Sequence, residues 1–411
     1  MPTVQQAAAA IEASRSAAQK PASDDDRVTP LELFFDLVFV FAVTQVTQLL
    51  ADRPTWEGLA QALILLTLVW WAWAGYAWLT NTLDTDRDGV RLVMFAAMIA
   101  MFVVSLAIPG AFGQQAVLFA VAYSVVRAAH ILLFGLATNE ASVKQAVRGL
   151  TPTVAASCAL VLAASSLDGL AQGAVFLVAI AIDYGGGLRG AERWTLHSGY
   201  FAERHGLIIL IALGESVVAT GIGAADTDLG AAEITAGALA MSVAAALWWA
   251  YFDVVALVAE HRLQDAVPGR AQNALARDAY SYLHLVFIAA IVLVALGSKK
   301  VIGAVDEPLK LVPAVALCGG LALYLLGHVA FRLRTLGTLN RQRLVAAATA
   351  AALIPLAAHV DALVTLALVT VVACALIAYE AIRFRETRAL VRARARARTA
   401  TQPGRVAAGP G

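Results

Sequence analysis

Charge and cysteine are both scarce in this chain of 411 residues. Only 14% of the residues are charged, whereas about 25% are charged in an average soluble domain, so a water-soluble fold of this size would have too little polar surface. The three cysteines, Cys158, Cys318 and Cys374, lie apart from one another in apolar runs. Because none belongs to a CxxC pair or a Cys/His cluster, the sequence favours neither a disulfide framework nor a zinc site.

Motifs of catalysis and nucleotide binding are also missing. The chain has no HExxH motif and no convincing Ser/His/Asp set, and the glycines at Gly185–Gly187 lack the spacing of a phosphate-binding loop. The first apolar run, from Leu31, is not followed by a cleavage signature, so we expect its helix to remain in the protein. We therefore expect no enzyme activity, no cofactor, no metal site and no nucleic-acid partner.

Hydrophobic residues make up 60% of the chain. They recur in runs close to the roughly 20 residues that cross a ~30 Å hydrocarbon core as a helix. We therefore predict an all-α polytopic membrane protein with about twelve transmembrane helices. The predicted spans lie at about 31–50, 59–79, 90–108, 116–136, 152–167, 169–186, 204–222, 234–258, 279–297, 311–331, 344–359 and 361–382.

Lys and Arg are distributed unevenly over the connections between these spans. The N-terminal segment, the even-numbered connections and the C-terminal tail hold 25 of the 30 Lys and Arg residues, the opposite side holds four, and Arg127 lies within a span. Cationic loops are retained on the cytoplasmic side. We therefore expect a bacterial inner-membrane protein with both termini in the cytoplasm.

Two polar segments flank the spans. Residues 1–30 are predicted to be a disordered cytoplasmic N-terminus, and residues 385–411 a basic cytoplasmic tail. Arginines at alternate positions of the tail, from Arg392 to Arg398, would attract anionic lipid headgroups by about 1 kcal/mol per charge. The alternative is a solvated, disordered tail that only sets the topology.

Several motifs of the first six spans recur in the second six. An even number of spans per repeat gives both halves the same orientation, so the repeat is parallel, an arrangement found in secondary transporters. The expected divisions are a first six-helix repeat at 31–187, a cytoplasmic linker at 188–202 and a second repeat at 203–384. The matching motifs are Trp70-Trp71-Ala72 with Trp248-Trp249-Ala250, Arg87-Asp88 with Arg277-Asp278, and Asp168 with Asp361.

The first span begins Glu32-Leu-Phe-Phe-Asp36, and span seven contains Glu203-Arg-His-Gly206 and Leu213-Gly-Glu215. Together with Trp248-Trp-Ala-Tyr-Phe-Asp253 and Arg277-Asp-Ala-Tyr-Ser-Tyr-Leu-His284, these motifs resemble the low temperature requirement A (LtrA) family of bacterial membrane proteins. The resemblance implies a multi-pass helical fold in the inner membrane. It implies no substrate, because the family is named for a growth phenotype in the cold.

Ionisable residues at lipid depth are the candidate functional residues. Each costs about 2.5 to 3.5 kcal/mol on insertion scales, so such residues usually face a bundle interior or an aqueous cavity. Most are predicted about five to ten residues from the cytoplasmic boundary of their spans, which predicts a polar vestibule open to the cytoplasm and closed by an apolar outer half. The candidates for a substrate or ion pathway are Glu32, Asp36, Arg127, His130, Glu215, Asp253 and His284.

Span four carries the deepest arginine. Tyr123, Arg127 and His130 follow an i, i+4, i+7 spacing, so they share one helix face. Arg127 cannot readily lose its proton and needs a carboxylate at the same depth. Because Glu215 of span seven is expected at that depth, we predict an intramembrane Arg127–Glu215 ion pair across the interface between the halves.

The candidate residues allow two interpretations. They either form a permeation or binding site, or they are structural ion pairs and hydrogen bonds that lock helices together; isolated histidines such as His130 and His284 are typical of a satisfied core. For the function, we expect a secondary transporter of an unidentified small solute, with proton coupling as an option because buried carboxylates and histidines can carry protons. The alternatives are an ion channel and a non-transporting membrane protein in envelope or cold adaptation.

Overall fold

The chain folds into a bundle of long helices. A computed structural model describes residues 28–83, 85, 87–137, 141–187, 195–225 and 230–401, and every named element in them is a helix. The expected N-terminal segment up to residue 27 and part of the expected linker, 188–194, lie outside the described residues.

In the described residues, the first half of the bundle consists of six long helices and the short 3₁₀ helix η1 (Ile108–Gly110), which follows the third of them. The first of them begins with a capping box: Glu32 accepts a hydrogen bond from the backbone N–H of Thr29 at 2.8 Å, and the Thr29 hydroxyl accepts one from the Glu32 N–H. Pro30 takes the first helical position, where its missing N–H is not needed. The helices are α2 (Pro30–Asp52), α3 (Trp56–Thr82), α4 (Asp88–Ala107), α5 (Ala116–Ala137), α6 (Ala141–Ala164) and α7 (Gly169–Gly187).

The second half contains more interrupted helices. Two π-helical segments, η3 (Ala276–Tyr282) and η4 (Val315–Gly319), lie within long helices. The other elements are α8 (Ser198–Ala225), α9 (Ala231–Phe252), α10 (Val255–Gln264), α11 (Arg270–Leu275), α12 (Leu283–Ile302), α13 (Leu311–Ala314), α14 (Gly320–Leu336), α15 (Arg341–Ala357), α16 (Ala362–Arg383) and α17 (Arg385–Thr401).

Among the described residues, eleven helices are long and apolar enough to cross a membrane, which confirms a multi-span helical fold. The expected span at 344–359 coincides with α15, which has 17 residues and therefore rises only about 26 Å. That length falls short of a ~30 Å hydrocarbon core, and α15 is not one of the eleven. Residues 385–401 form the helix α17, although one of the two expectations for this tail was a disordered segment. The tail is rich in Ala and Arg, which are both good helix formers.

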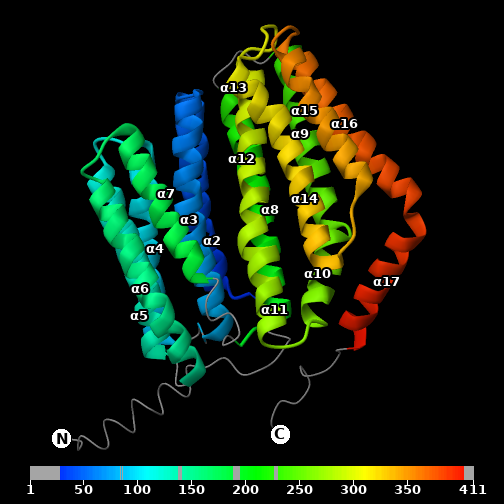
Figure 1. The fold of residues 1–411 in the computed structure, drawn as a ribbon. Coiled ribbons are helices and arrows are strands. Elements are labelled where there is room, and N and C mark those ends of the chain that lie inside the picture. Colours follow the sequence, from blue (N-terminus) through cyan, green and yellow to red (C-terminus); the bar gives the residue numbers. More distant parts are fainter. Residues whose placement is uncertain are drawn as a thin grey trace, which may run out of the picture.

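The long helices run side by side, and the two halves of the chain form neighbouring groups (Figure 1). The start of α2, at Pro30, and the short helix α11 lie at the same end of the bundle, called here the Pro30 end. The opposite end, where α2 finishes at Asp52, is called the Asp52 end. In the first half α2 packs on α3 and α4, α5 packs on α4 and α6, and α7 packs on α3 and α6. The second half has the same order of contacts: α8 packs on α9 and α12, α14 packs on α12 and α15, and α16 packs on α9 and α15.

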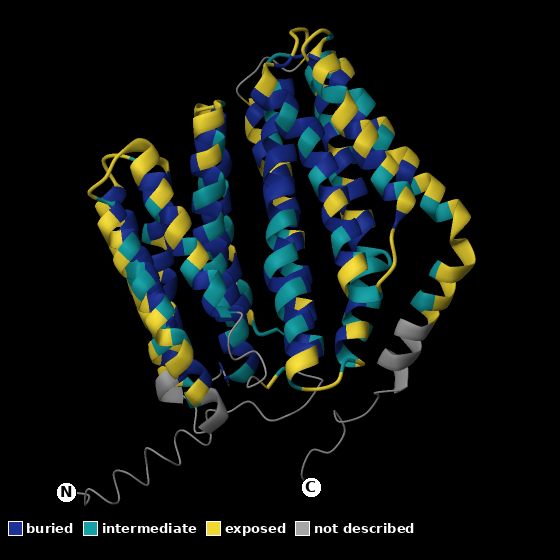
Figure 2. Ribbon diagram, in the orientation of Figure 1, coloured by how far each residue is buried: buried dark blue, intermediate teal, exposed yellow. Residues whose placement is uncertain are grey.

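The outer surface of the bundle is apolar. Figure 2 shows exposed residues along the outward faces of the peripheral helices and buried residues along the inward faces. Large apolar side chains such as Leu92, Ile99 and Val121 are exposed there, together with Leu177, Val371 and others. Contiguous exposed apolar surface of this kind fits contact with lipid rather than water. The candidate span Arg270–Ile302, which contains α12, is the most buried.

The packing of α12 on η4 and α14 depends on two glycines. A Cβ atom on Gly297 would lie 2.5 Å from the Leu317 Cβ and 2.7 Å from the Leu317 Cα, and one on Gly320 would lie 3.0 Å from the Leu293 Cβ. Close backbone approach between membrane helices is typical of small residues.

We expect Gly297→Val to lower stability by at least about 1 to 3 kcal/mol, the usual cost of overpacking a core. Thermal unfolding of the purified protein in detergent measures the effect. The matched control is Gly214→Val in α8, because nothing lies within 4 Å of a Cβ at Gly214. Equal melting temperatures for the two variants would contradict the close packing of α12 on η4.

Candidate functional site

A buried ion pair joins the first helices of the two halves. Asp36 of α2 and Arg204 of α8 lie 3.0 Å apart, and both side chains are 0% exposed. The same Asp36 oxygen accepts a hydrogen bond from the Trp73 indole N–H at 2.7 Å. A charge in the bundle interior is costly unless it is paired, so Asp36 and Arg204 depend on each other.

The ion pair belongs to a larger polar cluster, called here the seam network, of Glu32, Asp36, Thr80, Tyr200 and Arg204. The Tyr200 hydroxyl lies 2.5 Å from a Glu32 oxygen and 2.9 Å from the Thr80 hydroxyl. Arg204 also donates to the Thr80 hydroxyl. The network therefore ties α2, α3 and α8 together, and it contains two of the predicted site residues, Glu32 and Asp36.

Arg204 and Tyr200 were not predicted as candidate site residues. The expected span began at 204, so Arg204 was counted among the cytoplasmic loop charges, whereas α8 begins at Ser198 and places Arg204 inside the bundle. The spacing of Tyr200 and Arg204, which is i to i+4, was the available signal, since it puts both side chains on one helix face.

Aromatic rings and histidines fill the space beside the seam network. His205 of α8 packs against Trp73 with ring centroids 5.0 Å apart and against His284 at 5.3 Å. One His284 nitrogen lies 2.7 Å from the Tyr251 hydroxyl and the other 3.0 Å from the Ala279 carbonyl oxygen. Because both ring nitrogens have partners and the ring is fully buried, His284 fits the interpretation as a satisfied core histidine.

The π-helical segment η3 presents its polar groups to the first half. The carbonyl oxygen of Ser281 accepts the Trp70 indole N–H at 2.7 Å, and the Ser281 hydroxyl accepts the Trp78 indole N–H at 2.9 Å. Tyr282 donates to the Tyr184 carbonyl oxygen at 3.0 Å. π-Helical turns are frequent at functional sites, and this one links α12 to α3 and α7.

The predicted Arg127–Glu215 pair is wrong. The Nη2 atom of Arg127 donates to both oxygens of Asp183 on α7 at 2.8 Å, and both residues are buried. Glu215 instead lies beside Thr44 of α2 and near Lys299 of α12. The ion pair of Arg127 therefore connects two helices of the first half rather than the two halves.

The pairing was predicted wrongly because the start of the helix that carries Glu215 was misplaced. Arg127 lies ten residues from Ala137, the end of α5 at the Pro30 end, and Glu215 lies seventeen residues from Ser198, the start of α8. The expected span began at 204, so the earlier start of α8 moves Glu215 about 9 Å farther from that helix end than predicted. Asp183 was overlooked because it lies only four residues before Gly187, the end of α7.

The pocket called here the α5 pocket lies next to Arg127, between α3, α5, α6 and α7 of the first half and α11 and η3 of the second half. Its volume is about 70 Å³. Arg127 and His130, both predicted, line it from α5, and Tyr123 on the same helix face is fully buried. The other lining residues are Trp71, Ala74, Gly75, Trp78, Phe134, Ala146, Leu150, Gly186, Gly187, Asn273 and Arg277.

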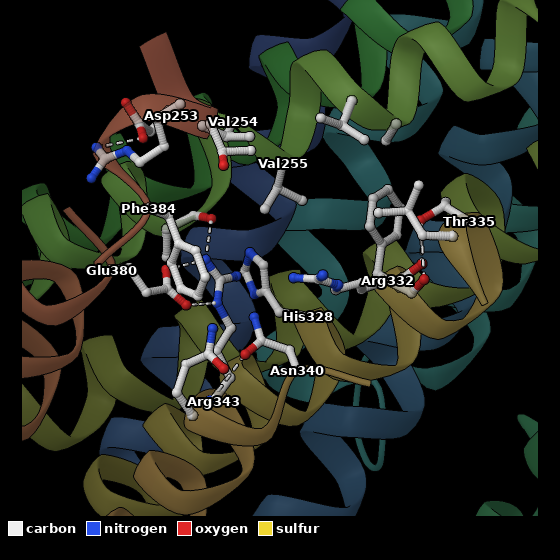
Figure 3. A pocket seen from close by; sticks show the side chains of 18 of the residues that line it. Asp253, Val254, Val255, His328, Arg332, Thr335, Asn340, Arg343, Glu380 and Phe384 are labelled. Carbon is white, nitrogen blue, oxygen red and sulfur yellow. Dashed lines mark hydrogen bonds and ion pairs between the residues drawn. The ribbon is translucent and has the colours of Figure 1, made fainter. Parts of the chain in front are cut away.

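A second cavity of about 200 Å³, called here the α14 pocket, lies between α9, α14, α15 and α16 (Figure 3). Arg343 forms a bidentate pair with Glu380, at 2.9 and 2.8 Å, on one wall. Asp253, a predicted site residue, also lines the pocket and is paired with Arg388 at 2.5 Å and with Arg392, both from α17. His328 and Arg332 of α14 also line the pocket.

Both pockets lie in the half of the bundle nearer the Pro30 end. The structure does not bring all seven predicted residues to one place. Glu32 and Asp36 lie in the seam network, and Arg127 and His130 in the α5 pocket. Asp253 lies in the α14 pocket, while His284 is in the aromatic core and Glu215 is beside Lys299. Among the described residues no group of three or more His, Cys, Asp or Glu is placed to hold a metal ion.

The apolar outer surface, the candidate spans and the buried ion pairs define a multi-pass helical membrane protein. A sequence profile of the bacterial low temperature requirement A protein (LtrA) matches residues 27–378. The chain therefore belongs to the LtrA family, as the motifs from Glu32 to His284 indicated.

A relative supports this assignment. The chain is similar to an uncharacterized protein of Rhizobium meliloti (strain 1021), with 26% identity over 324 residues that cover 75% of this chain and 78% of the relative. No solved structure matches the chain.

Proposed function

We propose that the protein is a secondary transporter of a small solute in the bacterial inner membrane, rather than an enzyme. The observation that carries the proposal is the Asp36–Arg204 pair: a fully buried charge pair at the contact between two six-helix groups. Intramembrane charges at such a contact are a functional-site hypothesis, and binding at the interface between halves is a feature of transporters with parallel repeats.

The proposed architecture is twelve spans in two parallel six-helix repeats, with α15 as the short eleventh span. The corresponding order of helix contacts in the two halves supports the repeat. Tyr76 of α3 donates to the Val126 carbonyl of α5 at 3.0 Å, and Tyr324 of α14 donates to the Leu247 carbonyl of α9 at 2.9 Å, so helices two and four are bonded in both halves.

Coupling to protons is the proposed source of energy. Asp36 would exchange its proton during transport, since its second oxygen, Oδ2, has no hydrogen-bond partner among the described residues. Protonation would neutralise Asp36 and release Arg204, which would loosen the contact between α2 and α8.

Uptake by purified protein in liposomes tests the transporter proposal. With a pH-sensitive dye inside the vesicles, we expect a saturable proton flux when one of a panel of amino acids, carboxylates or sugars is added. The flux should be absent in Asp36→Asn and unchanged in the exposed variant Arg334→Gln. Unitary currents in planar bilayers would instead favour the alternative of an ion channel, and silence in both assays would favour a non-transporting membrane protein.

We further propose that the Pro30 end faces the cytoplasm, as the Lys and Arg distribution predicts. In intact cells of a strain that makes a cysteine-free variant, a membrane-impermeant thiol reagent should label Ser166→Cys, at the Asp52 end, and fail to label Asp265→Cys, at the Pro30 end. Both positions are exposed, so both should react in permeabilised cells. The reverse pattern in intact cells would invert the topology.

The basic helix α17 is proposed to contact anionic lipid. It runs from the end of α16 towards the Pro30 end (Figure 1), where the proposed topology puts the inner-leaflet headgroups, and its arginines would each gain about 1 kcal/mol there. Binding to vesicles that contain phosphatidylglycerol should fall when Arg394, Arg396 and Arg398 are replaced by Gln. Unchanged binding would leave α17 with a topological role only.

A further inference from the structure

The α5 pocket and the α14 pocket occupy the same place in the two halves. The α5 pocket is lined by α3, α5, α6 and α7, which are the second, fourth, fifth and sixth helices of the first half, and also by α11 and η3 of the second half. The α14 pocket is lined by α9, α14, α15 and α16, which are the second, fourth, fifth and sixth long helices of the second half, and also by α10 and α17.

The linings of the two pockets correspond as well. Each contains the second tryptophan of a Trp-Trp-Ala motif, Trp71 or Trp249, and a histidine from the fourth helix of its half, His130 or His328. An arginine pairs with a carboxylate beside each pocket, Arg127 with Asp183 and Arg343 with Glu380. Each of these arginines also faces a backbone carbonyl oxygen of that motif, Trp71 at 3.5 Å and Ala250 at 3.2 Å.

Hydrogen-bond donors at the α5 pocket lack acceptors. Only Nη2 of Arg127 donates to Asp183, so Nη1 has only the 3.5 Å contact with the Trp71 carbonyl oxygen and Nε has no partner among the described residues. Neither ring nitrogen of His130 makes a hydrogen bond of normal geometry, although the side chain is buried. Leaving such groups unsatisfied is costly, so an acceptor in the pocket would stabilise the protein.

The lining of the α5 pocket presents cationic donors and, among the described residues, no carboxylate of its own. Arg127 and Arg277 line it, and their carboxylate partners, Asp183 and Asp278, lie beside the lining. The cavity of about 70 Å³ has room for several water molecules, and hence for a solute of a few heavy atoms. Trp71 and Trp78 supply apolar walls.

The α14 pocket also presents a guanidinium group as a donor. Its two carboxylates, Asp253 and Glu380, are already paired with arginines. Arg332 donates to the Thr338 hydroxyl at 2.9 Å and has no carboxylate partner within 4 Å among the described residues. The lining therefore has one guanidinium group in excess, next to the buried His328.

We propose that each half holds one site for a small carboxylate anion, in the α5 pocket and in the α14 pocket. A carboxylate matches the planar guanidinium donors of Arg127 and Arg332, and its apolar group fits the aromatic walls. This inference rests on the proposed function, because it names a small carboxylate as the solute that the transporter carries.

Calorimetric titration of the purified full-length protein with sodium acetate tests the proposal, with ionic strength held constant by sodium gluconate, a larger anion. We expect two acetate ions per chain and no heat from methylammonium. Gly75→Ala should weaken one site at least roughly tenfold, because the new Cβ would lie 3.0 Å from the His130 Cε1 and 3.1 Å from the Arg127 Nη1. Arg332→Gln should weaken the other site.

Two matched variants separate these effects from folding. A Cβ on Gly214 has nothing within 4 Å, and Arg334, on the same helix as Arg332, does not line the α14 pocket; Gly214→Ala and Arg334→Gln should bind two acetate ions. Native-like binding by Gly75→Ala and Arg332→Gln, or a single site in the unaltered protein, would overturn the paired sites. Proton-coupled uptake of another solute without acetate binding would refute this inference alone, and acetate binding without any transport would refute the proposed function alone.

Discussion

Removal of either Asp36 or Arg204 is expected to destabilise the folded protein by about 3 to 5 kcal/mol, the typical cost of leaving one member of a buried ion pair without its partner. Both side chains are 0% exposed, so water cannot compensate the stranded charge. Asp36→Leu and Arg204→Met should each lower the melting temperature and the amount of protein that accumulates in the membrane.

The double variant is the informative measurement for this pair. Replacing both charges by apolar side chains of similar size removes the desolvation cost together with the attraction, so Asp36→Leu/Arg204→Met should recover part of the loss. Arg334→Ala is the control, because its partner Asp278 is partly exposed and such pairs contribute about 0 to 1 kcal/mol. Strictly additive single effects would show that Asp36 and Arg204 are not coupled.

A second large effect is expected at Arg127 and Asp183. Arg127→Met and Asp183→Leu should each cost about 3 to 5 kcal/mol, since both residues are buried and bonded to each other in a bidentate pair. The double variant should be more stable than the sum of the single losses predicts.

Glu215 supplies the matched comparison for Arg127. Because Glu215 lies beside Thr44 and Lys299 rather than Arg127, the effects of Glu215→Leu and Arg127→Met should add within about 0.5 kcal/mol. A coupling energy between Arg127 and Glu215 that exceeds the coupling between Arg127 and Asp183 would restore the pairing predicted from the sequence.

The prediction for Arg127 shows what residue patterns can and cannot provide. Chemistry alone requires a carboxylate near a buried arginine, and that requirement is met. The identity of the partner depends on helix ends, which the apolar runs locate only within a few residues. An error of six residues at the start of α8, Ser198 instead of 204, shifts Glu215 by about 9 Å along the helix axis.

The motif beginning with Glu32 and Asp36 could be recognised as a site from the sequence because two acidic residues occur one turn apart near the start of an apolar run. Their partners could not be recognised. Tyr200 and Arg204 look like residues of a polar connection until α8 is known to begin before them. The correspondence of His130 and His328 also escaped detection, because its offset of 198 positions differs from that of the tryptophan motifs.

The distribution of polar contacts between the halves has a consequence for how they could separate. Towards the Pro30 end, the seam network, the bonds of Asn81 to the His197 backbone and the bond of Tyr282 to Tyr184 all join the two halves. Near the Asp52 end, Lys299 of α12 donates a hydrogen bond of 3.0 Å to Gln48 of α2. Parting the halves at the Asp52 end therefore breaks fewer hydrogen bonds, and the Pro30 end is the natural position for a hinge between them.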